Sequence, residues 1–440
     1  MSLQELDMGL LIVISLLTSV VMLLAIVFYP KVKFGKLEFD TYWIVTLIGA
    51  LLLILFGLLD IPRIMDGLTV NTSINPLKIL ILFLSMTFIS IVLDELSFFK
   101  YLAHITLKRA GNSQIKIFIY LYIIVSVLTI FTSNDVIILT FTPFICYFSK
   151  YANINPIPYL VAEFVAANTW SMALIIGNPT NIYLATSYGI NFIDYLSVMI
   201  LPTFVSSCVA FLVLYLLFRK PLSQPITPKF ENVVLPNKPA LVLGLVHLSL
   251  CTTVLAVSSY IGIEMWMVAL FFALSLLVGI WLLYRINKKY PQALIPSVKR
   301  VPWQFVPFII SMFVIVLALS DYQVTKIIAD FLNNNYPILS YGSASFLAAN
   351  LINNIPMSVL FSFVLEYCYP ANLIAAVYAV IIGSNIGAFL TPFGALAGIM
   401  WMNVVKSTGI RYSFVQFVKY GVIISIPTLF TALFVLSFIV

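Results

Sequence analysis

Apolar stretches long enough to cross a bilayer recur along the whole chain, and this recurrence limits the possible folds more than any other feature. A helix needs about 20 mostly apolar residues to span the hydrocarbon core. Of the 440 residues, 62% are hydrophobic and 9% are charged, whereas an ordinary soluble domain has roughly 25% charged residues. The sequence therefore predicts one all-α integral membrane domain and no separate soluble domain.

Two apolar runs are interrupted by polar residues in a way that predicts re-entrant helical hairpins. The run near 117–149 is interrupted at Thr132-Ser133-Asn134-Asp135, and the run near 341–366 at Asn353-Asn354-Ile355-Pro356. The arms on either side are too short for two comfortable crossings. A hairpin that enters and leaves on one face fits each run better than a pair of spans.

Two further helices are predicted to break inside the membrane. The helix near 157–188 contains Gly177-Asn178-Pro179-Thr180-Asn181, and the helix near 372–402 contains a polar stretch from Ser384 to Gly394. The hydrophilic stretch 221–238 predicts a linker between two halves, residues 1–220 and 239–440, that repeat the same pattern. We expect about ten transmembrane helices, two of them broken, plus the two hairpins.

The distribution of basic residues predicts the orientation. Most of the 23 Lys and Arg residues lie in a few segments, and the remaining loops hold only Arg63, Lys78 and Lys326. Cytoplasmic loops carry an excess of Lys and Arg, so the basic segments are expected inside and both termini outside the cytoplasmic membrane. The halves then have opposite orientations, and matched broken segments in inverted repeats indicate a midplane transport site. The basic segments are 31–36, 100–116, 150, 219–238, 285–300 and 406–419.

The breaks supply groups that suit a transported ion. Half-helix N-termini favour anions, while loose carbonyls and Asn or Thr oxygens suit Na⁺. Such breaks persist inside hydrocarbon where they are buried in protein or line a cavity, and four matched breaks favour a binding site over packing kinks. The predicted substrate- and ion-binding residues are Ser133, Asn134, Asp135, Asn168, Asn178, Pro179, Thr180, Asn181, Asn353, Asn354, Asn385, Thr391, Pro392 and Gly394.

Two acids inside apolar stretches are predicted to bind the coupling ion, Na⁺ or H⁺. Asp135 lies at a hairpin tip, far along the chain from Lys116 and Lys150, and a carboxylate at that depth is expensive unless it has a function. Glu163 lies about two turns into the first broken helix. We predict no resident cofactor, and Na⁺ at the tips and breaks as the sole metal ion.

Motifs of enzymes are missing from the sequence. There is no Gly-rich phosphate loop ending in Gly-Lys-Ser/Thr, no Gly-x-Ser-x-Gly elbow, no His-Glu-x-x-His helix and no Cys-x-x-Cys pair. The four cysteines share no metal-ligand spacing. We therefore expect a transporter rather than an enzyme, without direct use of ATP by this chain.

Several strings resemble those of bacterial arsenical pump membrane proteins, within the wider ion transporter superfamily that includes citrate-type and sodium/divalent-anion symporters. They are 93–99 (Leu-Asp-Glu-Leu-Ser-Phe-Phe), 133–135, 177–181, 195–199 leading to 218–220, and 390–394 (Leu-Thr-Pro-Phe-Gly). The resemblance implies a small anion or oxyanion as substrate, a homodimer, and an elevator-like movement of a domain that contains the hairpins. For an arsenite pump it also implies a separate ATPase subunit.

Two departures leave the substrate open. Arsenite pumps typically carry Asp where this sequence has Asn168 and Asn385, and an amide cannot exchange protons. Arsenite or antimonite efflux is the first expectation. A sodium- or proton-coupled symporter of di- or tricarboxylates is the second, favoured by the Asn and Thr oxygens of 177–181, and a sodium/proton antiporter is the third.

Overall fold

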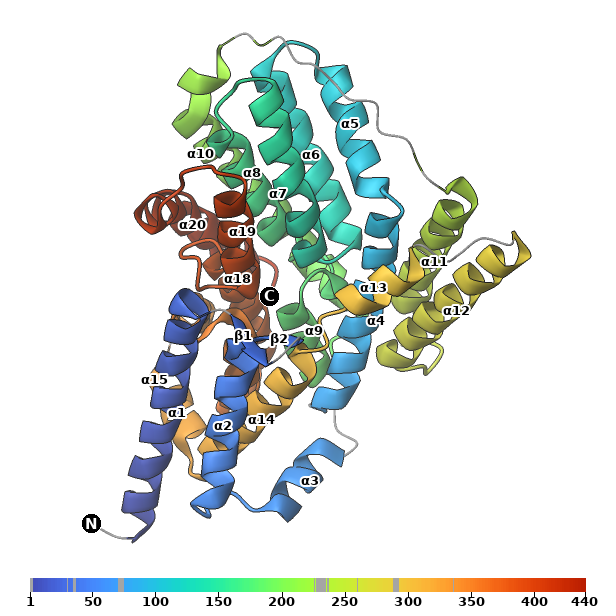
Figure 1. Cartoon of the computed structure of the whole chain (residues 1–440). Helices are drawn as coiled ribbons and strands as arrows, with labels where there is room; N and C mark the ends of the chain where they lie inside the picture. The colour runs from blue at the N-terminus through green and yellow to red at the C-terminus, as the bar shows by residue number, and fades with distance from the viewer. Residues whose placement is uncertain are drawn as a thin grey trace.

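The structure is a computed structural model of the chain, and it describes residues 3–440 except 30, 35–36, 70–74, 225, 227–234, 236, 259, 288–292 and 335. It is built from helices and one two-stranded antiparallel sheet (Figure 1). In the described part of the chain, nine helices are long and apolar enough to cross a membrane. The predicted all-α membrane fold is confirmed.

The first half runs from the N-terminus to a long helix that ends at Leu222. Its elements are α1 (Leu3–Phe28), β1 (Lys31–Phe34), β2 (Leu37–Asp40), α2 (Thr41–Leu55), α3 (Ile61–Thr69), α4 (Pro76–Glu95), α5 (Phe98–Ala110), α6 (Gln114–Phe131), α7 (Asn134–Tyr151), α8 (Ile157–Trp170), the 3-10 turn η1 (Ile175–Gly177), α9 (Pro179–Ser187) and α10 (Phe192–Leu222).

The second half begins at Lys238 and follows the same order of long helices, short helices, hairpin and broken helix. Its elements are α11 (Lys238–Val257), α12 (Met265–Ile286), α13 (Leu294–Arg300), α14 (Phe305–Asp321), α15 (Val324–Leu332), α16 (Pro337–Ile352), α17 (Asn354–Val364), the 3-10 turns η2 (Leu365–Tyr367) and η3 (Pro370–Asn372), α18 (Leu373–Gly387), α19 (Leu396–Ser407) and α20 (Phe414–Leu436).

Matching helices of the two halves pack against each other in a reciprocal way. Helix α2 packs against α14, and its counterpart α12 packs against α4; likewise α7 packs against α19 and α17 against α9. The corners that lead into α5 and α15 also match, because Ser97 (φ 63°) and Gln323 (φ 62°) are both non-glycine residues in the left-handed region. This exchange is the packing expected of two inverted repeats.

Local sequence signals explain where several helices begin. The side chain of Asn75 accepts hydrogen bonds from the backbone N–H groups of Leu77 and Lys78, and Pro76 occupies the first turn of α4. Ser413 and Gln416 form a reciprocal capping box at the start of α20. The two hairpins and both broken helices appear where the polar interruptions predicted them.

Three features differ from the sequence expectation. Residues 31–34 of the basic segment 31–36 form strand β1, which pairs with β2 so that Lys31 lies opposite Asp40. Strands of only four residues leave no clear pattern in the sequence. The polar stretch 100–116 contains most of an amphipathic helix, α5. The first break opens at residue 171, before Gly177, because α8 already ends at Trp170. The boundaries 1–220 and 239–440 of the halves stay a prediction, with most of the linker outside the described residues.

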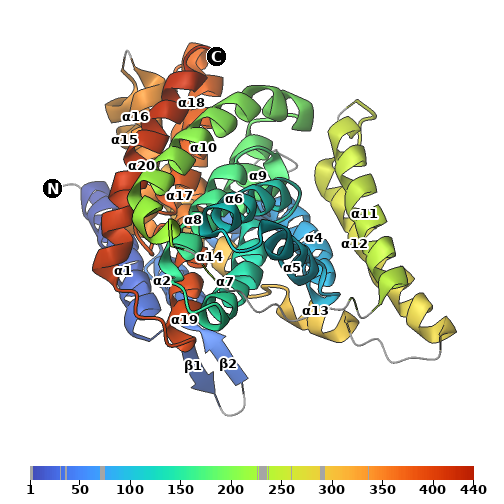
Figure 2. The same cartoon turned by 90° about the horizontal axis from the view of Figure 1, so that it is seen from above.

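The two ends of the molecule carry different elements. In the view from above, the β1–β2 hairpin and α13 lie at one edge and the C-terminus lies at the opposite edge (Figure 2). The helices with the hairpins and breaks form the buried centre, where α8 and α18 have almost entirely buried side chains. The strongly exposed apolar side chains lie on outer helices such as α1, α11 and α12.

Candidate functional site

Asn385 on α18 joins the two broken helices. Its side-chain oxygen accepts hydrogen bonds from Asn178 Nδ2 and Ser171 Oγ, both at 2.9 Å. Its Nδ2 donates to Asn181 Oδ1 at 2.7 Å and to the carbonyl oxygen of Ile381 at 2.8 Å. All hydrogen-bonding capacity of the amide is used, so the breaks of the two halves are held together at this residue.

The first break exposes backbone groups that neighbouring side chains satisfy. Asn178 caps α9 through a hydrogen bond from the Thr180 N–H to its Oδ1 at 3.1 Å. Asn181 Nδ2 donates to the carbonyl of Ser171 at 2.7 Å. A Cβ atom on Gly177 would lie 2.3 Å from the same carbonyl, so only glycine fits this close approach.

The tip of the first hairpin contacts the first broken helix. The backbone N–H of Asp135 donates to Asn134 Oδ1 at 2.9 Å, and Asn134 Nδ2 donates to Asn168 Oδ1 at 3.2 Å. Asn168 in turn donates to the Phe164 carbonyl at 2.8 Å. The hydroxyl of Ser133 is buried without a hydrogen-bond partner among the described residues.

The tip of the second hairpin contacts the second break. Asn353 has a φ of 74° and donates from Nδ2 to the carbonyl of Phe393 at 3.1 Å. The backbone N–H of Asn354 donates to the carbonyl of Gly394 at 3.1 Å. A Cβ on Gly394 would lie 2.3 Å from the Gly387 carbonyl, which explains the glycine there.

Asn350 is a central residue of this second cluster that the sequence analysis missed. Its Oδ1 accepts from Thr391 Oγ1 at 2.7 Å and from the Thr391 N–H at 3.1 Å. Its Nδ2 donates to the carbonyls of Phe346 and Gly387. The signal available in the sequence was its position one turn before the hairpin tip, in the string 350–354 (Asn-Leu-Ile-Asn-Asn).

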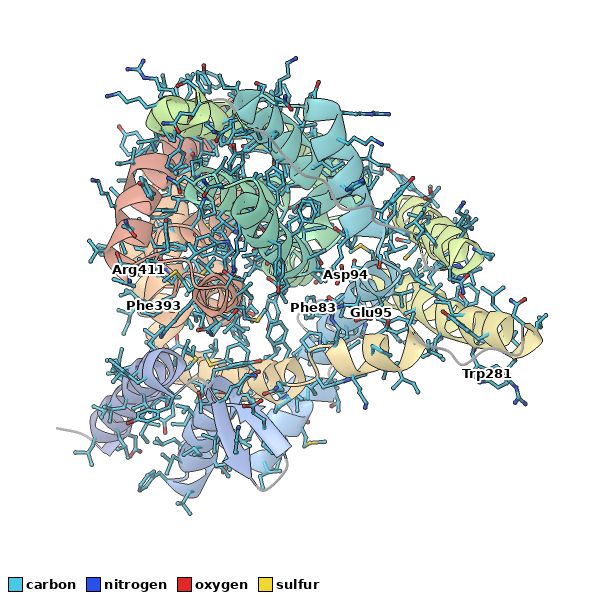
Figure 3. The ribbon with its side chains drawn as sticks, turned by 45° about the horizontal axis from the view of Figure 1, so that its top comes forward. Phe83, Asp94, Glu95, Trp281, Phe393 and Arg411 are labelled. Atoms are coloured by element: carbon cyan, nitrogen blue, oxygen red, sulfur yellow. The ribbon has the colours of Figure 1, made fainter. Side chains whose placement is uncertain are left out.

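Asp135 lies at the wall of a cavity of about 560 Å³. No described side chain donates a hydrogen bond to its carboxylate, and it interacts electrostatically with Tyr42. Phe83 lies beside this space (Figure 3). Other lining residues are Thr87, Ile91, Val136, Leu139, Leu396, Ile399, Met400 and Asn403, with Lys31, Glu38, Asp40, Lys299, Arg300 and Gln304 also on its walls.

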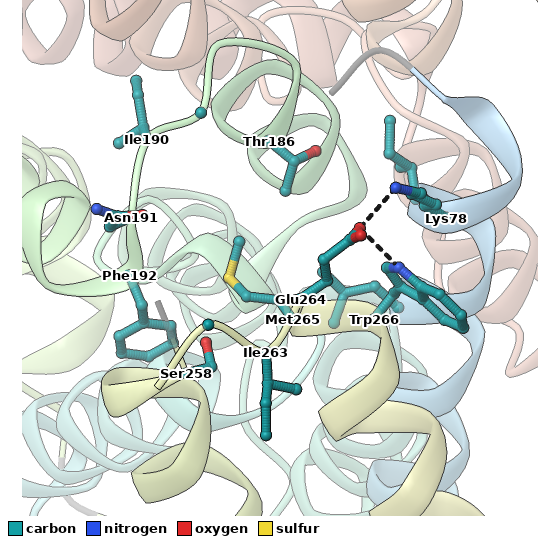
Figure 4. Close-up of a pocket in the computed structure, with 14 residues that line it drawn as sticks. Lys78, Thr186, Ile190, Asn191, Phe192, Ser258, Ile263, Glu264, Met265 and Trp266 are labelled. Carbon is teal, nitrogen blue, oxygen red and sulfur yellow. Dashed lines mark hydrogen bonds and ion pairs between the residues drawn. The ribbon is translucent and has the colours of Figure 1, made fainter. Parts of the chain in front are cut away.

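A second cavity, of about 420 Å³, lies between the start of α4, the loop from α9 to α10 and the loop from α11 to α12. The Lys78 ammonium donates to Glu264 Oε2 at 2.7 Å, and Trp266 Nε1 donates to the same oxygen at 2.9 Å (Figure 4). Like the cavity beside Asp135, it is lined by the loop between the first two helices of one half. It has α11–α12 where the first cavity has the β1–β2 hairpin.

Most of the predicted site residues therefore lie in two adjoining clusters. Asn134, Asn168, Asn178, Thr180 and Asn181 belong to the cluster around Asn385. The second cluster has Asn353, Asn354, Thr391, Pro392 and Gly394, and it joins the first through α18, where Asn385 and Gly387 are two residues apart. Pro179 is the first residue of α9. Glu163 lies outside both clusters, fully buried beside Trp401 and Thr142.

The sequence of this chain is similar to those of known membrane transporters. The model of the family described as citrate transporter matches residues 41–377. The arsenical pump membrane protein of Escherichia coli strain K12 is 28% identical over 423 residues, which cover 90% of this chain and 92% of that protein. The arsenical pump membrane protein of Yersinia enterocolitica is 27% identical over 380 residues, covering 81% and 85% of the two chains.

Two solved structures have the same fold at low sequence identity. The Alcanivorax borkumensis YdaH transporter aligns with a TM-score of 0.58 and 11% identity over 98% of both chains. Neisseria gonorrhoeae MtrF aligns with a TM-score of 0.53 and 13% identity, covering 98% of this chain and 94% of that one. Since the family model covers most of the chain, this protein is a multi-pass membrane transporter that belongs to the citrate transporter family.

Proposed function

We propose that this secondary transporter exports arsenite or antimonite from the cell. The observation that carries the proposal is the charge of the site. The segments 132–135, 171–181, 350–354 and 385–395 contain one charged side chain, Asp135, and no Lys or Arg. Arsenous and antimonous acids are neutral trihydroxides at neutral pH. Amide and hydroxyl groups satisfy such a solute, whereas a polycarboxylate calls for cationic partners in a buried site.

The cavity beside Asp135 supplies the route to this site. Its walls include the β1–β2 hairpin and α13, which carry the basic side chains Lys31, Lys299 and Arg300. If basic segments are cytoplasmic, the cavity faces the cytoplasm and both termini lie outside. The molecule then has an inward-facing conformation. The smaller cavity at Lys78 and Glu264 marks the outer side, where the site would open in the outward-facing conformation.

A sodium- or proton-coupled carrier of di- or tricarboxylates is the second candidate. It is favoured by the family's description as citrate transporter and by the lysines and arginine in the cavity wall. A sodium/proton antiporter is the third. The predicted homodimer and the separate ATPase subunit rest on the resemblance to arsenical pumps and stay predictions.

Transport by purified protein in proteoliposomes tests the proposal. We expect uptake or exchange of arsenite and antimonite by the wild type, and a loss in Asn178→Ala, which removes a hydrogen bond to Asn385. Asn287→Ala is the matched control, because among the described residues this exposed amide donates to the Leu283 carbonyl at the end of α12. Citrate transport without arsenite transport would instead support the second candidate and overturn the first.

A further inference from the structure

Glu163 is a fully buried acid that the solute site does not use. It lies on α8 and contacts α7 of the first hairpin and α19 of the second broken helix. Trp401 Nε1 on α19 donates to Glu163 Oε2 at 3.2 Å, and Thr142 Oγ1 on α7 lies 3.2 Å from Glu163 Oε1. The acid therefore connects a hairpin arm of the first half with the broken helix of the second.

The hydrogen-bond partners of Glu163 suit its protonated form. A threonine hydroxyl has a single proton, and Thr142 Oγ1 lies 2.6 Å from the Ile138 carbonyl, its partner one turn earlier. That short contact uses the hydroxyl proton. Thr142 Oγ1 also lies 3.2 Å and 3.3 Å from the two carboxyl oxygens of Glu163, so a protonated Glu163 can donate to this hydroxyl while its carboxyl group accepts from the Trp401 indole N–H. These partners accommodate a carboxylic acid that keeps its proton.

The surroundings agree with a neutral acid. No charged side chain acts on the Glu163 carboxyl in the described part of the chain. On α7, the titratable group facing it is the Cys146 thiol, and Lys150 at the end of that helix is exposed. On α8 itself, the Tyr159 hydroxyl is bound to Gln114. An ionised carboxylate here would be buried without a cation, which is costly.

In the described part of the second half, no charged side chain acts on the Glu163 carboxyl. Lys406, at the end of α19, is exposed. Tyr412 packs edge-on against Trp401 with ring centroids 5.2 Å apart, and Tyr420 stacks on Tyr412. Phe164 and Phe417 complete this aromatic surrounding. These aromatic side chains enclose the Glu163 carboxyl, and they can separate if α19 moves relative to α8.

We propose that Glu163 is the proton-binding site through which the transporter uses the proton gradient, an inference that rests on the proposed function. During export, a hydronium ion on the outer side gives its proton to the carboxylate and becomes water, and the carboxylic acid then forms the bonds to Thr142 and Trp401. When α7 or α19 moves and water enters from the cytoplasmic side, the acid gives its proton to a water molecule and returns ionised. One proton enters the cell for each cycle, and Asp135 stays free to contact the solute or a cation.

Glu163→Gln tests this assignment, because glutamine mimics the protonated acid. Its Nε2 donates to Thr142 and its Oε1 accepts from Trp401, so folding is preserved. We expect exchange of arsenite across proteoliposomes without a pH gradient to continue, and accumulation driven by a pH gradient to be lost. Glu366→Gln, at an exposed acid after α17, is the control and should retain both. Retained gradient-driven accumulation in Glu163→Gln would overturn the proposal.

Infrared difference spectroscopy of the purified protein gives a readout that needs no transported solute. The wild type minus Glu163→Gln spectrum should show the carbonyl stretch of a protonated carboxylic acid, and Trp401→Phe should shift this band. Absence of the band while arsenite exchange proceeds would overturn the proton site and leave the proposed function intact. Presence of the band in a protein that transports no arsenite would support the proton site and refute the proposed substrate.

Discussion

Asn385 shows how a single amide organises the centre of this transporter. It has hydrogen bonds to Ser171, Asn178 and Asn181 of the first broken helix and to its own helix backbone. An aspartate at this position would place an acceptor against Asn181 Oδ1 and the Ile381 carbonyl unless it carried a proton. The amide therefore fixes a junction between the halves that does not depend on pH.

Replacing this amide should weaken the junction. In Asn385→Ala each buried partner left unsatisfied costs about 1–3 kcal/mol, so we expect a clearly lower thermal unfolding temperature in detergent. Asn385→Asp and Asn168→Asp should each be less stable in alkaline than in acidic buffer. Transport by either variant should depend more strongly on the pH gradient than transport by the wild type. Asn287→Ala is the control, within about 0.5 kcal/mol of wild type. Equal stability of Asn385→Ala and Asn287→Ala would refute the junction.

Asp135 differs from Asn385 in having no hydrogen bond to its carboxylate from described side chains. Asp135→Asn keeps the size and removes a charge that is costly at this depth. Since Asp135 is predicted to contact the solute or a cation, we expect coupled transport in proteoliposomes with imposed ion gradients to be abolished, while the unfolding temperature stays level or rises. Full coupled transport by this variant would refute the role of Asp135, whatever its stability.

At the scale of elements, polar interruptions in the sequence were sufficient to locate both hairpins and both broken helices. Clusters of proline, glycine and asparagine within an apolar run leave backbone groups that need partners inside the membrane, so the breaks are visible from composition. Asn350 was missed because it lies inside a regular helix, and its role arises from Thr391, which is distant in sequence. The β1–β2 hairpin was missed because its strands are too short for a period-two pattern.

Ion pairs connect elements of opposite halves at matching corners. Arg300 on α13 pairs with Asp94 and Glu95 at the end of α4, at 2.7 Å and 2.6 Å. Arg63 on α3 pairs with Asp321 at the end of α14 at 2.8 Å. Figure 3 shows Asp94 and Glu95 where α4 approaches α13. These pairs tie short helices of one half to the buried helix of the other.

The Lys78–Glu264 pair predicts a pH effect on stability. The hydrogen bond from Lys78 lowers the pKa of Glu264 below its ordinary value. The contribution is therefore present at neutral pH and lost as the pH falls through this lowered pKa. Since Glu264 is 46% exposed, solvent limits it to less than about 1 kcal/mol. The difference in unfolding temperature between wild type and Glu264→Gln should vanish in acid; a difference that persists there would contradict this account.

At the scale of the molecule, the orientation is predicted from the distribution of charge, and labelling can test it. A cysteine in place of Asn112, between α5 and α6, should react with an impermeant thiol reagent only from the cytoplasmic side. A cysteine in place of Asn334, between α15 and α16, should react in whole cells. Both side chains are exposed, so access decides the outcome. Labelling of the Asn112 cysteine from outside would refute the inverted orientation of the halves.

The central claim is that the four breaks form one solute site for a neutral trihydroxide. A ligand that binds only the folded protein raises its apparent stability, so thermal unfolding of the purified protein with arsenite, antimonite, citrate, succinate, sulfate or Na⁺ tests the claim most directly. We predict that arsenite or antimonite raises the unfolding temperature of the wild type and of Asn287→Ala, but not of Asn178→Ala. Stabilisation by citrate alone, or equal stabilisation of Asn178→Ala, would contradict the account.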